Sequence, residues 1–424
     1  MTHAARLPED VARAIADPKS YAEWDNFHRM LVKVRRETPF ARAEIDDYQP
    51  FWVASKYDDI QTVARQNTQF LSGLGGLQTT SALKFQIEAG TGTQFRSVVA
   101  MNEPDHMKYR TLTQAWFLPR NLKQLEARVR QLAKTYVDKL AALGGACDFV
   151  SEVAVHFPLM VIMAILGVPD EDEPMMLRLT QEFFGANDDD LSRAKASMTP
   201  LEAEAAQAEV IAEFNAYFRH VSAERRRHPT DDLASVIANA TIDGEPISDI
   251  DAMGYYVTIA FAGHDTTSSS VAGAIWALAE RPDELARVRS DPSLIPGLVD
   301  EAVRWTTPIH QVVRRAVSDS EVRGQTVRAG DWVVLLFPSG NRDEDVFEDP
   351  FDFRSNRRPS KQIGFGYGAH VCLGQHLARM EMSIFFEELL PRLTHIELAG
   401  RPTRTATNFV GGPKFLPVKY RMSH

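Results

Sequence analysis

Cysteine is scarce in this sequence, which has only two, Cys147 and Cys372, among its 424 residues. Two such distant cysteines cannot build the disulfide framework of a small secreted protein, and they lack the close ligand spacing of a structural zinc site. Any chemistry that depends on cysteine must therefore rest on one of them. We interpret Cys147, within Gly145–Asp148, as a small buried side chain without a chemical role.

Long apolar runs and blocks of basic residues are also missing. No segment approaches the roughly 20 apolar residues that span a bilayer, and the segment Met1–Tyr21 carries acids and lacks the apolar core of a signal peptide. A net charge of −10 argues against nucleic-acid binding, because that affinity comes mainly from neutralised phosphates. We expect a cytoplasmic protein that binds neither nucleic acid nor membrane.

Apolar residues recur at helical spacing through most of the chain. The predicted helices are Ala22–Glu37, Pro104–Trp116, Leu122–Leu143, Ser151–Leu166, Asp170–Phe184, Leu201–Arg227, Asp231–Ala238, Ser248–Ala279, Asp283–Arg289, Ile295–Trp305 and Leu373–Leu390. The few predicted strands are Phe51–Ala54, Gln311–Val317 and Val333–Leu336. Helical patterns closely flank the most linker-like stretch, Gly185–Pro200. We therefore predict a mainly α fold with a small β portion, in a single large helical domain over residues 1–424.

The segment Ser248–Ala279 predicts a long central helix. Ser248 and Asp251 fit a capping box, and Pro282 follows the other end. At about 1.5 Å per residue, its roughly 32 residues would span about 48 Å, enough to cross the domain. Its first half is apolar nearly all round, which indicates burial, but the polar run His264–Ser270 interrupts the pattern. Since buried polar groups are costly unless paired, this run is either a paired core network or a working site.

Cys372 lies between a glycine-rich stretch and a predicted helix. Gly364, Gly366 and Gly368 allow the backbone to approach a ligand closely. A sulfur at a helix N-terminus is favoured as the thiolate, which is the form that binds haem iron. A phosphate loop would need a following Gly-Lys-Ser/Thr and a leading strand, which this segment lacks. A glycine-rich turn before an amphipathic helix remains the structural alternative.

Four motifs, in the same order as in the family, resemble the cytochrome P450 enzymes. They are His106-x-x-x-Arg110, similar to the propionate-binding helix; Ala262–Thr267, similar to the oxygen-activation segment; Glu301-x-x-Arg304, similar to the structural Glu/Arg motif; and Phe365-x-x-Gly368-x-x-x-Cys372-x-Gly374, similar to the haem-binding signature. The similarity covers essentially the whole chain. Segments such as Leu166–Pro169 and Asn408–Lys414 resemble the bacterial α-terpineol hydroxylase subfamily more closely.

The resemblance implies a haem b cofactor whose iron is bound by the Cys372 thiolate. The positions implied to contact the cofactor are His106, Arg110, Arg314 and His370, which would bind the propionates, together with Phe365 and Gly263. Arginine suits a carboxylate because it offers a bidentate fork. For His106 and Arg110 alone, spaced i, i+4, the alternative is a pair of surface cations.

Asp265 and Thr266 are the predicted catalytic pair. A threonine hydroxyl inside a helix can bond back to a carbonyl about one turn earlier and distort the helix locally, which would make room for dioxygen near Ala262 and Gly263. A carboxylate beside a hydroxyl can relay protons from water to dioxygen. An ordinary mid-helix threonine is the alternative. For His264 we expect a structural or solvent-facing role.

Glu301 and Arg304 lie on one face of a predicted helix. An exposed pair of this kind contributes roughly 0.2–0.5 kcal/mol. The resemblance instead implies a buried network with a second arginine, Arg357, that supports the Cys372 loop. Related chains usually have an acid three residues before that arginine, whereas this chain has Arg354, so this part of the network departs from the family's pattern.

The resemblance implies a monooxygenase that hydroxylates a small apolar substrate with dioxygen and two electrons. Helical spacing from Thr266 and family-like segments predict the substrate contacts Thr258, Ile259, Ala262, Ile309, Val312 and Phe409. Leu71–Val98, with its glycines and few charges, is predicted to be a mobile lid. This apolar lining with little fixed charge favours a monoterpenoid or an alkyl-aromatic hydrocarbon.

The expected electron donor is an iron–sulfur ferredoxin with its NAD(P)H-dependent reductase, because the chain encodes no flavin module. Basic residues such as Lys361 and Arg379, on the face behind Cys372, would meet an acidic partner. Two alternatives differ in class. A haem-thiolate gas sensor would need an output domain, and a peroxide-using enzyme or isomerase would have little need for the Asp265–Thr266 pair.

Overall fold

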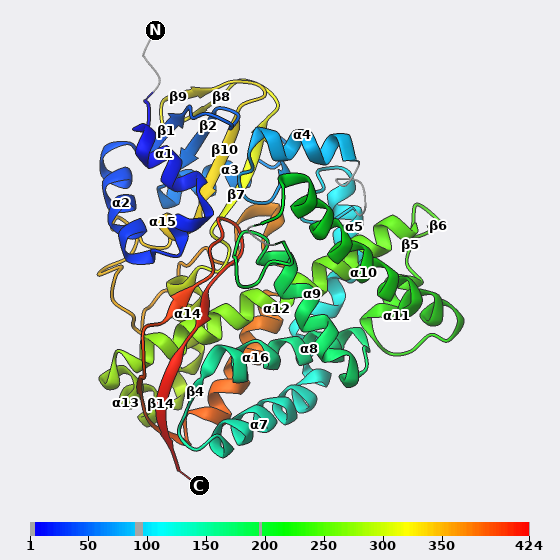
Figure 1. Cartoon of the computed structure of the whole chain (residues 1–424), viewed down its shortest axis with the longest axis vertical. Coiled ribbons are helices and arrows are strands. Elements are labelled where there is room, and N and C mark those ends of the chain that lie inside the picture. Colours follow the sequence, from blue (N-terminus) through cyan, green and yellow to red (C-terminus); the bar gives the residue numbers. More distant parts are fainter. Residues whose placement is uncertain (1–4, 90–95, 195–196, 424) are drawn as a thin grey trace.

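Helices make up most of the computed structural model, which describes residues 5–89, 96–194 and 197–423 (Figure 1). The helices are α1 (Glu9–Ala16), α2 (Trp24–Glu37), α3 (Tyr57–Arg65), α4 (Thr80–Ala89), α5 (Asp105–Gln114), α6 (Pro119–Leu122), α7 (Glu126–Ala142), α8 (His156–Leu166), α9 (Glu173–Phe184), α10 (Pro200–Arg227), α11 (Leu233–Ala238), α12 (Asp249–Ala279), α13 (Pro282–Ser290), α14 (Ile295–Thr306), α15 (Phe337–Gly340) and α16 (Gln375–Leu389). The predicted mainly α class is confirmed. Within these ranges, no helix is both long enough and apolar enough to cross a membrane.

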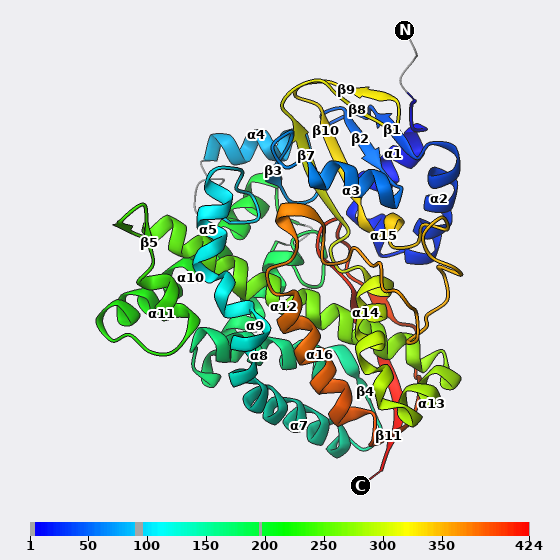
Figure 2. The same cartoon turned by 180° about the vertical axis from the view of Figure 1, so that it is seen from behind.

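The main sheet combines strands from distant parts of the chain, and lies beside the N-terminal helices (Figure 2). Its order is β1 (Phe40–Ala43), β2 (Phe51–Ala54), β10 (Trp332–Leu336), β7 (Gln311–Ala316) and β3 (Phe70–Leu74). β2 and β10 pair in parallel, and the other neighbours are antiparallel. The three predicted strands are therefore confirmed to within one residue.

The remaining strands form smaller sheets. β4 (Ala146–Asp148) pairs with β14 (Pro417–Met422), which also pairs with β11 (Leu393–Leu398). The two-stranded sheets are β5 (Thr241–Ile242) with β6 (Glu245–Pro246), β8 (Ser320–Val322) with β9 (Gln325–Val327), and β12 (Thr403–Arg404) with β13 (Pro413–Phe415). Buried apolar side chains form one large cluster through the helical part and two smaller clusters around the main sheet.

The central helix α12 runs through the middle of the helical part (Figure 1). Its 31 residues begin after Ser248, whose hydroxyl accepts the Asp251 N–H at 3.2 Å. The Asp251 carboxylate returns to the Ser248 hydroxyl at 2.6 Å, so the reciprocal bond of the expected capping box goes to the side chain. α8, α10, α14 and α16 pack around α12. The predicted long buried helix is therefore confirmed.

Part of the predicted lid, Leu71–Val98, is regular structure. β3 pairs with β7 in the main sheet, and α4 follows it. Since the backbone hydrogen bonds of a paired strand are already used, the prediction of a mobile cover is wrong for β3. Residues 90–95 of the predicted lid lie outside the described residues.

Candidate active site

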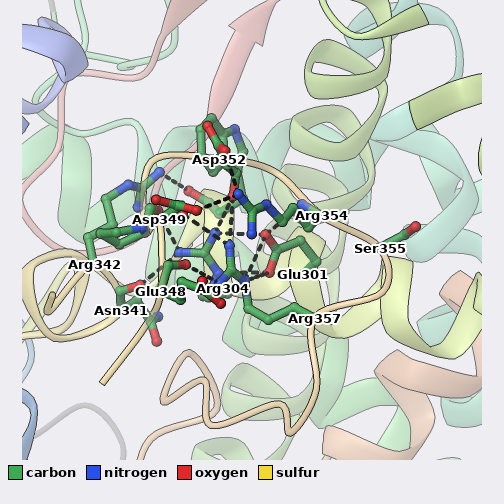
Figure 3. A network of polar contacts seen from close by, with 12 residues as sticks. Glu301, Arg304, Asn341, Arg342, Glu348, Asp349, Asp352, Arg354, Ser355 and Arg357 are labelled. Atoms are coloured by element: carbon green, nitrogen blue, oxygen red, sulfur yellow. Dashed lines mark hydrogen bonds and ion pairs between the residues drawn. The ribbon is translucent and has the colours of Figure 1, made fainter. Parts of the chain in front are cut away.

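A buried polar network lies beneath the loop that leads to Cys372 (Figure 3). Arg304 donates from Nε and Nη2 to the two carboxylate oxygens of Glu301, each at 2.7 Å. Arg357 donates to the same carboxylate from Nε, at 3.1 Å to Oε2. The Arg304 guanidinium also donates to the carbonyls of Asn341 and Pro350 at 2.9 Å. The predicted buried network is present, and the alternative of an exposed pair is wrong.

Arg354 occupies the position where the family's usual acid is missing. Its backbone N–H donates to Glu301 Oε1 at 2.9 Å, while its side chain pairs outward with Asp349 at 2.6 Å and Asp352 at 2.9 Å. The network is therefore completed by the backbone at this position. The positive side chain is neutralised by two acids outside the network.

The Cys372 loop has a backbone that only glycine adopts easily. Gly366 and Gly368 both have φ of +75°, and a Cβ on Gly368 would lie 2.4 Å from the Ala64 carbonyl oxygen. The Cys372 N–H donates to the Phe365 carbonyl at 2.8 Å, which closes the loop just before α16. The loop is thus held in shape by its glycines and by contact with α3.

The Cys372 sulfur is subject to opposing electrostatic effects. Burial among protein atoms raises the pKa of the thiol, whereas the Gly374 N–H and the guanidinium groups of Arg110 and Arg379 lower it. Arg110 donates to the Val371 carbonyl at 2.7 Å, and the Arg379 guanidinium lies over the Phe365 ring at 4.4 Å. Every charged neighbour named here therefore favours the thiolate.

Cys147 has a different environment on β4. Burial raises the pKa of its thiol to about 11, and its neighbour Tyr420 lowers it only in part. Cys147 lies in the β4–β14 ladder opposite Val418. These contacts agree with the interpretation of Cys147 as a packing residue.

Imidazole and guanidinium groups from three parts of the chain lie near one another. The rings of His106 on α5 and His370 in the Cys372 loop are 4.0 Å apart. Burial, followed by the charges of His106, Arg314 and Arg110, lowers the pKa of His370 to about 3. The alternative of His106 as a surface cation is wrong, because the residue is only 1% exposed.

Arg314 on β7 is buried, and burial lowers its pKa to about 10. Its one hydrogen bond within the described ranges, at 3.3 Å, goes to the neighbouring Val313 carbonyl. A buried guanidinium without an acid is unfavourable unless an anion accompanies it. Beside Cys372, these donors fit haem, which offers iron to the sulfur and two carboxylates to the cations.

One stripe of α12 has accessible surface, although the helix is otherwise largely buried. The stripe comprises Thr258, Ala262, Gly263, Asp265 and Thr266. The Thr266 hydroxyl donates to the Ala262 carbonyl at 2.7 Å, which is the back-bond that the sequence predicts. α12 remains continuous through these residues. The small side chains, and not a break in the helix, therefore provide room beside Ala262.

Gly263 has a packing role on α8. A Cβ at this position would lie 2.3 Å from Ile162 Cδ1. The absent side chain therefore allows close contact between α12 and α8. The predicted contact of Gly263 with the cofactor would involve its backbone only.

Most of the polar run His264–Ser270 is satisfied within the core. Buried His264 hydrogen-bonds through Nδ1 to the Thr180 hydroxyl at 2.9 Å and through Nε2 to the Val155 carbonyl at 2.7 Å. The solvent-facing role expected as one option for His264 is therefore wrong, and the structural role is confirmed. The neighbouring hydroxyls bond elsewhere: Thr267 to Glu381 at 3.0 Å, Ser268 to the Ala154 carbonyl and Ser270 to the Thr266 carbonyl at 2.9 Å.

Asp265 is the exception in this run. Its Oδ2 is buried without a hydrogen bond, 3.4 Å from His264 Nδ1. Asp265 lines a narrow pocket of about 50 Å³ together with Gln181, Phe184 and Lys414, which is large enough for ordered water. The unpaired carboxylate therefore faces a space that water can enter.

The predicted substrate residues fall into two groups. Thr258 and Ala262 lie on the accessible stripe of α12, whereas Ile259 beside them is only 7% exposed. Ile309, Val312 and Phe409 lie together, because Ile309 bridges Val410 and the His310 N–H donates to the Phe409 carbonyl at 2.8 Å. The Phe409 ring lies 6.3 Å from that of Phe184, which in turn lies 5.9 Å from that of Phe261 on α12.

Sequence reasoning missed two residues near this stripe. Ser97 approaches the Thr258 hydroxyl to 2.8 Å, and Glu381 on α16 accepts the Thr267 hydroxyl. Burial raises the pKa of Glu381 well above its usual value. Ser97 follows the predicted lid's glycines without any motif, and Glu381 reads as an ordinary surface acid, so neither carried a sequence signal.

A larger pocket, about 360 Å³, opens on the outer side of α9. Among its lining residues, His156 pairs with Glu173 at 2.5 Å and Arg178 pairs with Glu182 at 3.3 Å. It contains none of the predicted site residues. Its charged groups already neutralise one another, so we assign it no role.

Comparisons with known proteins agree with this site. The family model described as Cytochrome P450 matches residues 18–416. Cytochrome P450-terp from Pseudomonas sp is 45% identical over 98% of both chains, and linalool 8-monooxygenase from Pseudomonas putida is 31% identical over 92% of this chain and 95% of its own. The crystal structure of CYP108D1 from Novosphingobium aromaticivorans has a TM-score of 0.90 and 42% identity, covering 99% of this chain and all of its own.

Proposed function

The chain belongs to the cytochrome P450 family of haem-thiolate monooxygenases, and from this premise we propose that it hydroxylates a compact, largely apolar molecule of the monoterpenoid or alkyl-aromatic class. The reaction uses dioxygen and two electrons from a ferredoxin, and residues 1–424 act as one domain. One oxygen atom enters a C–H bond of the substrate, and the other leaves as water after taking up two protons.

Cys372 is the proposed sulfur ligand of the haem. Bound haem supplies the activation of dioxygen. The glycine-held loop and the favourable charges of Arg110 and Arg379 support this role, because they hold a thiolate in place. His106, Arg110, Arg314 and His370 would bind the propionates, with Phe365 and Gly263 against the macrocycle. The buried, acid-free Arg314 is the main support for an anionic ligand here.

Asp265 and Thr266 are the proposed proton-delivery residues. The unpaired Asp265 oxygen lines the narrow pocket, so it can take a proton from water and pass it toward the accessible stripe. The Thr266 hydroxyl, oriented by its bond to the Ala262 carbonyl, lies next along the chain. A carboxylate and a hydroxyl in this order suit proton transfer.

The accessible stripe of α12 is the observation that supports the substrate class. Apart from Asp265, its residues carry no charge, and Phe409, Ile309 and Val312 add apolar surface. A charged substrate would therefore find no buried counter-ion. Burying about 150 Å² of hydrocarbon would contribute roughly 4 kcal/mol at about 25 cal/mol per Å², which gives millimolar to micromolar affinity after the costs of binding.

The names of two relatives support the same class. Linalool 8-monooxygenase is named for a terpenoid substrate, and a Mycobacterium marinum cytochrome P450, 30% identical with a TM-score of 0.87, was solved in complex with pseudoionone. The test is a screen for the substrate-induced spin-state shift in the haem spectrum. Monoterpenes and alkylbenzenes should shift it. Tight binding of fatty acids or charged metabolites, without any shift by the hydrocarbons, would overturn the proposal.

The ferredoxin is proposed to dock behind Cys372. Lys361 is exposed there, while Arg379 is already paired with Asp300 at 3.0 Å. Reversal at Arg379 would also disturb the loop, so Lys361→Glu is the cleaner variant. Reduction of the enzyme by a ferredoxin should slow as salt rises and slow further in Lys361→Glu. Rates insensitive both to salt and to charge reversal would reject this docking face.

A further inference from the structure

A pair of hydroxyl groups lies at the N-terminal end of the accessible stripe. Ser97 Oγ and Thr258 Oγ1 are 2.8 Å apart, and both residues are half-buried. Thr258 lies eight positions before Thr266, so about 12 Å separates them along the helix axis at about 1.5 Å per residue. This pair is the polar feature of the stripe farthest from Asp265.

The backbone around Ser97 is fixed against α12. The Arg96 carbonyl packs on Gly254, where a Cβ would lie only 1.9 Å from its oxygen. The Arg96 guanidinium donates to the Tyr109 hydroxyl and to Asp251, each at 3.2 Å. Ser97 is therefore held in position before any ligand binds, which lowers the cost of using it in recognition.

The direction of the hydrogen bonds determines which group remains available. A hydroxyl has one proton and two acceptor lone pairs. Thr258 donates its proton to the Gly254 carbonyl at 2.6 Å, so Ser97 must be the donor between the two hydroxyls. The Val99 N–H donates weakly to Ser97 Oγ at 3.4 Å. The remaining capacity of Ser97 Oγ is one acceptor position.

We propose that Ser97 accepts a hydrogen bond from a hydroxyl group of the substrate. Resting on the function proposed above, this narrows the substrate to a compact apolar alcohol or phenol. With its hydroxyl at Ser97, the rest of the skeleton extends along the stripe toward Ala262 and Thr266. Hydroxylation then takes place at a carbon remote from the existing hydroxyl, and the product is a diol, with the second oxygen atom of dioxygen released as water.

The test compares three probes of one skeleton in spin-state titrations of the haem-loaded enzyme: α-terpineol, its methyl ether and limonene. The wild type should bind the alcohol more tightly than the ether, which cannot donate a hydrogen bond. Ser97→Ala should weaken alcohol binding about 3- to 10-fold, the range for one lost hydrogen bond, and change limonene binding less than about 2-fold. Ser97→Thr, which keeps a hydroxyl, should retain the preference for the alcohol.

Thr258→Val provides a second variant of nearly the same shape. It frees the Ser97 proton, so the preference for the alcohol over the ether should fall while limonene binding stays. An unchanged alcohol preference in both Ser97→Ala and Thr258→Val would overturn the inference. Limonene binding by the wild type without any alcohol preference would overturn it alone, whereas no shift by any of the three probes would overturn the proposed function as well.

Discussion

Glu301 and Arg304 face each other on α14 as a buried ion pair, joined by two hydrogen bonds of 2.7 Å. The residues are 2% and 1% exposed. The remaining Arg304 protons bind backbone carbonyls, and Glu301 also accepts from Arg357. The pair therefore ties α14 to the chain that leads into the Cys372 loop. Breaking it leaves a buried charge without a partner.

Loss of one partner should destabilise the fold strongly. We expect Glu301→Gln to lower the free energy of unfolding by about 3–5 kcal/mol, the typical cost of breaking a buried pair. The measurement is urea unfolding of the haem-loaded enzyme. Arg354→Ala is the matched control, since it removes only the outward pairs with Asp349 and Asp352 and should cost about 1 kcal/mol or less. Equal losses in both variants would contradict a buried role for Glu301.

Thr266 and its neighbour Thr267 should differ in function, although both are helical threonines. Thr266→Ala should retain haem and substrate binding but divert reducing equivalents to peroxide or water. Thr267 bonds to buried Glu381, so Thr267→Ala should lower stability and leave coupling nearly unchanged. The quantity to measure is product formed per NADH consumed. An unchanged yield in both Thr266→Ala and Asp265→Asn would exclude the proposed proton delivery.

His310 should make stability depend on pH. Burial, followed by the charge of Arg404, lowers its pKa from 6.5 to about 3. Between these values the unfolded state binds one more proton than the native state, so stability falls as pH decreases below 6.5. Between pH 6 and 5, His310→Asn should reduce the slope of unfolding free energy against pH by about 1.4 kcal/mol per unit. An identical slope, or a comparable change in exposed His220→Asn, would contradict this.

Arg314 should bind an anion at the expense of the fold. Because Arg314 is buried without an acid, Arg314→Gln should leave the haem-free protein as stable as the wild type or more so. Its affinity for haem should fall about 10-fold or more, the range for a lost charge-assisted hydrogen bond. Haem titration and unfolding of the apoprotein measure the two effects. Exposed Arg315→Gln, on the same strand, should change neither. Unchanged haem affinity in Arg314→Gln would contradict the role.

The sequence predicts the long amphipathic elements well. α2, α10 and α12 carry enough helical turns for the spacing of their apolar residues to be unambiguous. Helices α1, α3 and α4 were missed, because 8 to 10 residues give only two or three turns of pattern. The start of α8 was placed early, since a π-helical turn at Val150–Ala154 precedes it.

Contacts between distant segments limited the prediction of the site. The motif residues around Cys372 and Glu301 could be found, because their local spacing is specific. The parallel pairing of β2 with β10 and the approach of Ser97 to Thr258 join segments more than a hundred residues apart. No local pattern encodes such pairs. The burial of His264 was ambiguous for a related reason, because its partners Thr180 and Val155 lie on other helical segments.

The role of Cys372 as the iron ligand is most directly tested by the spectrum of the reduced, CO-treated enzyme. The wild type and Cys147→Ser should both give the strongly red-shifted haem band of thiolate ligation, because Cys147 lies in the β4–β14 ladder. Cys372→Ser should lose that band even where haem is still bound. Retention of the red-shifted band by Cys372→Ser, or its loss in Cys147→Ser, would contradict the account.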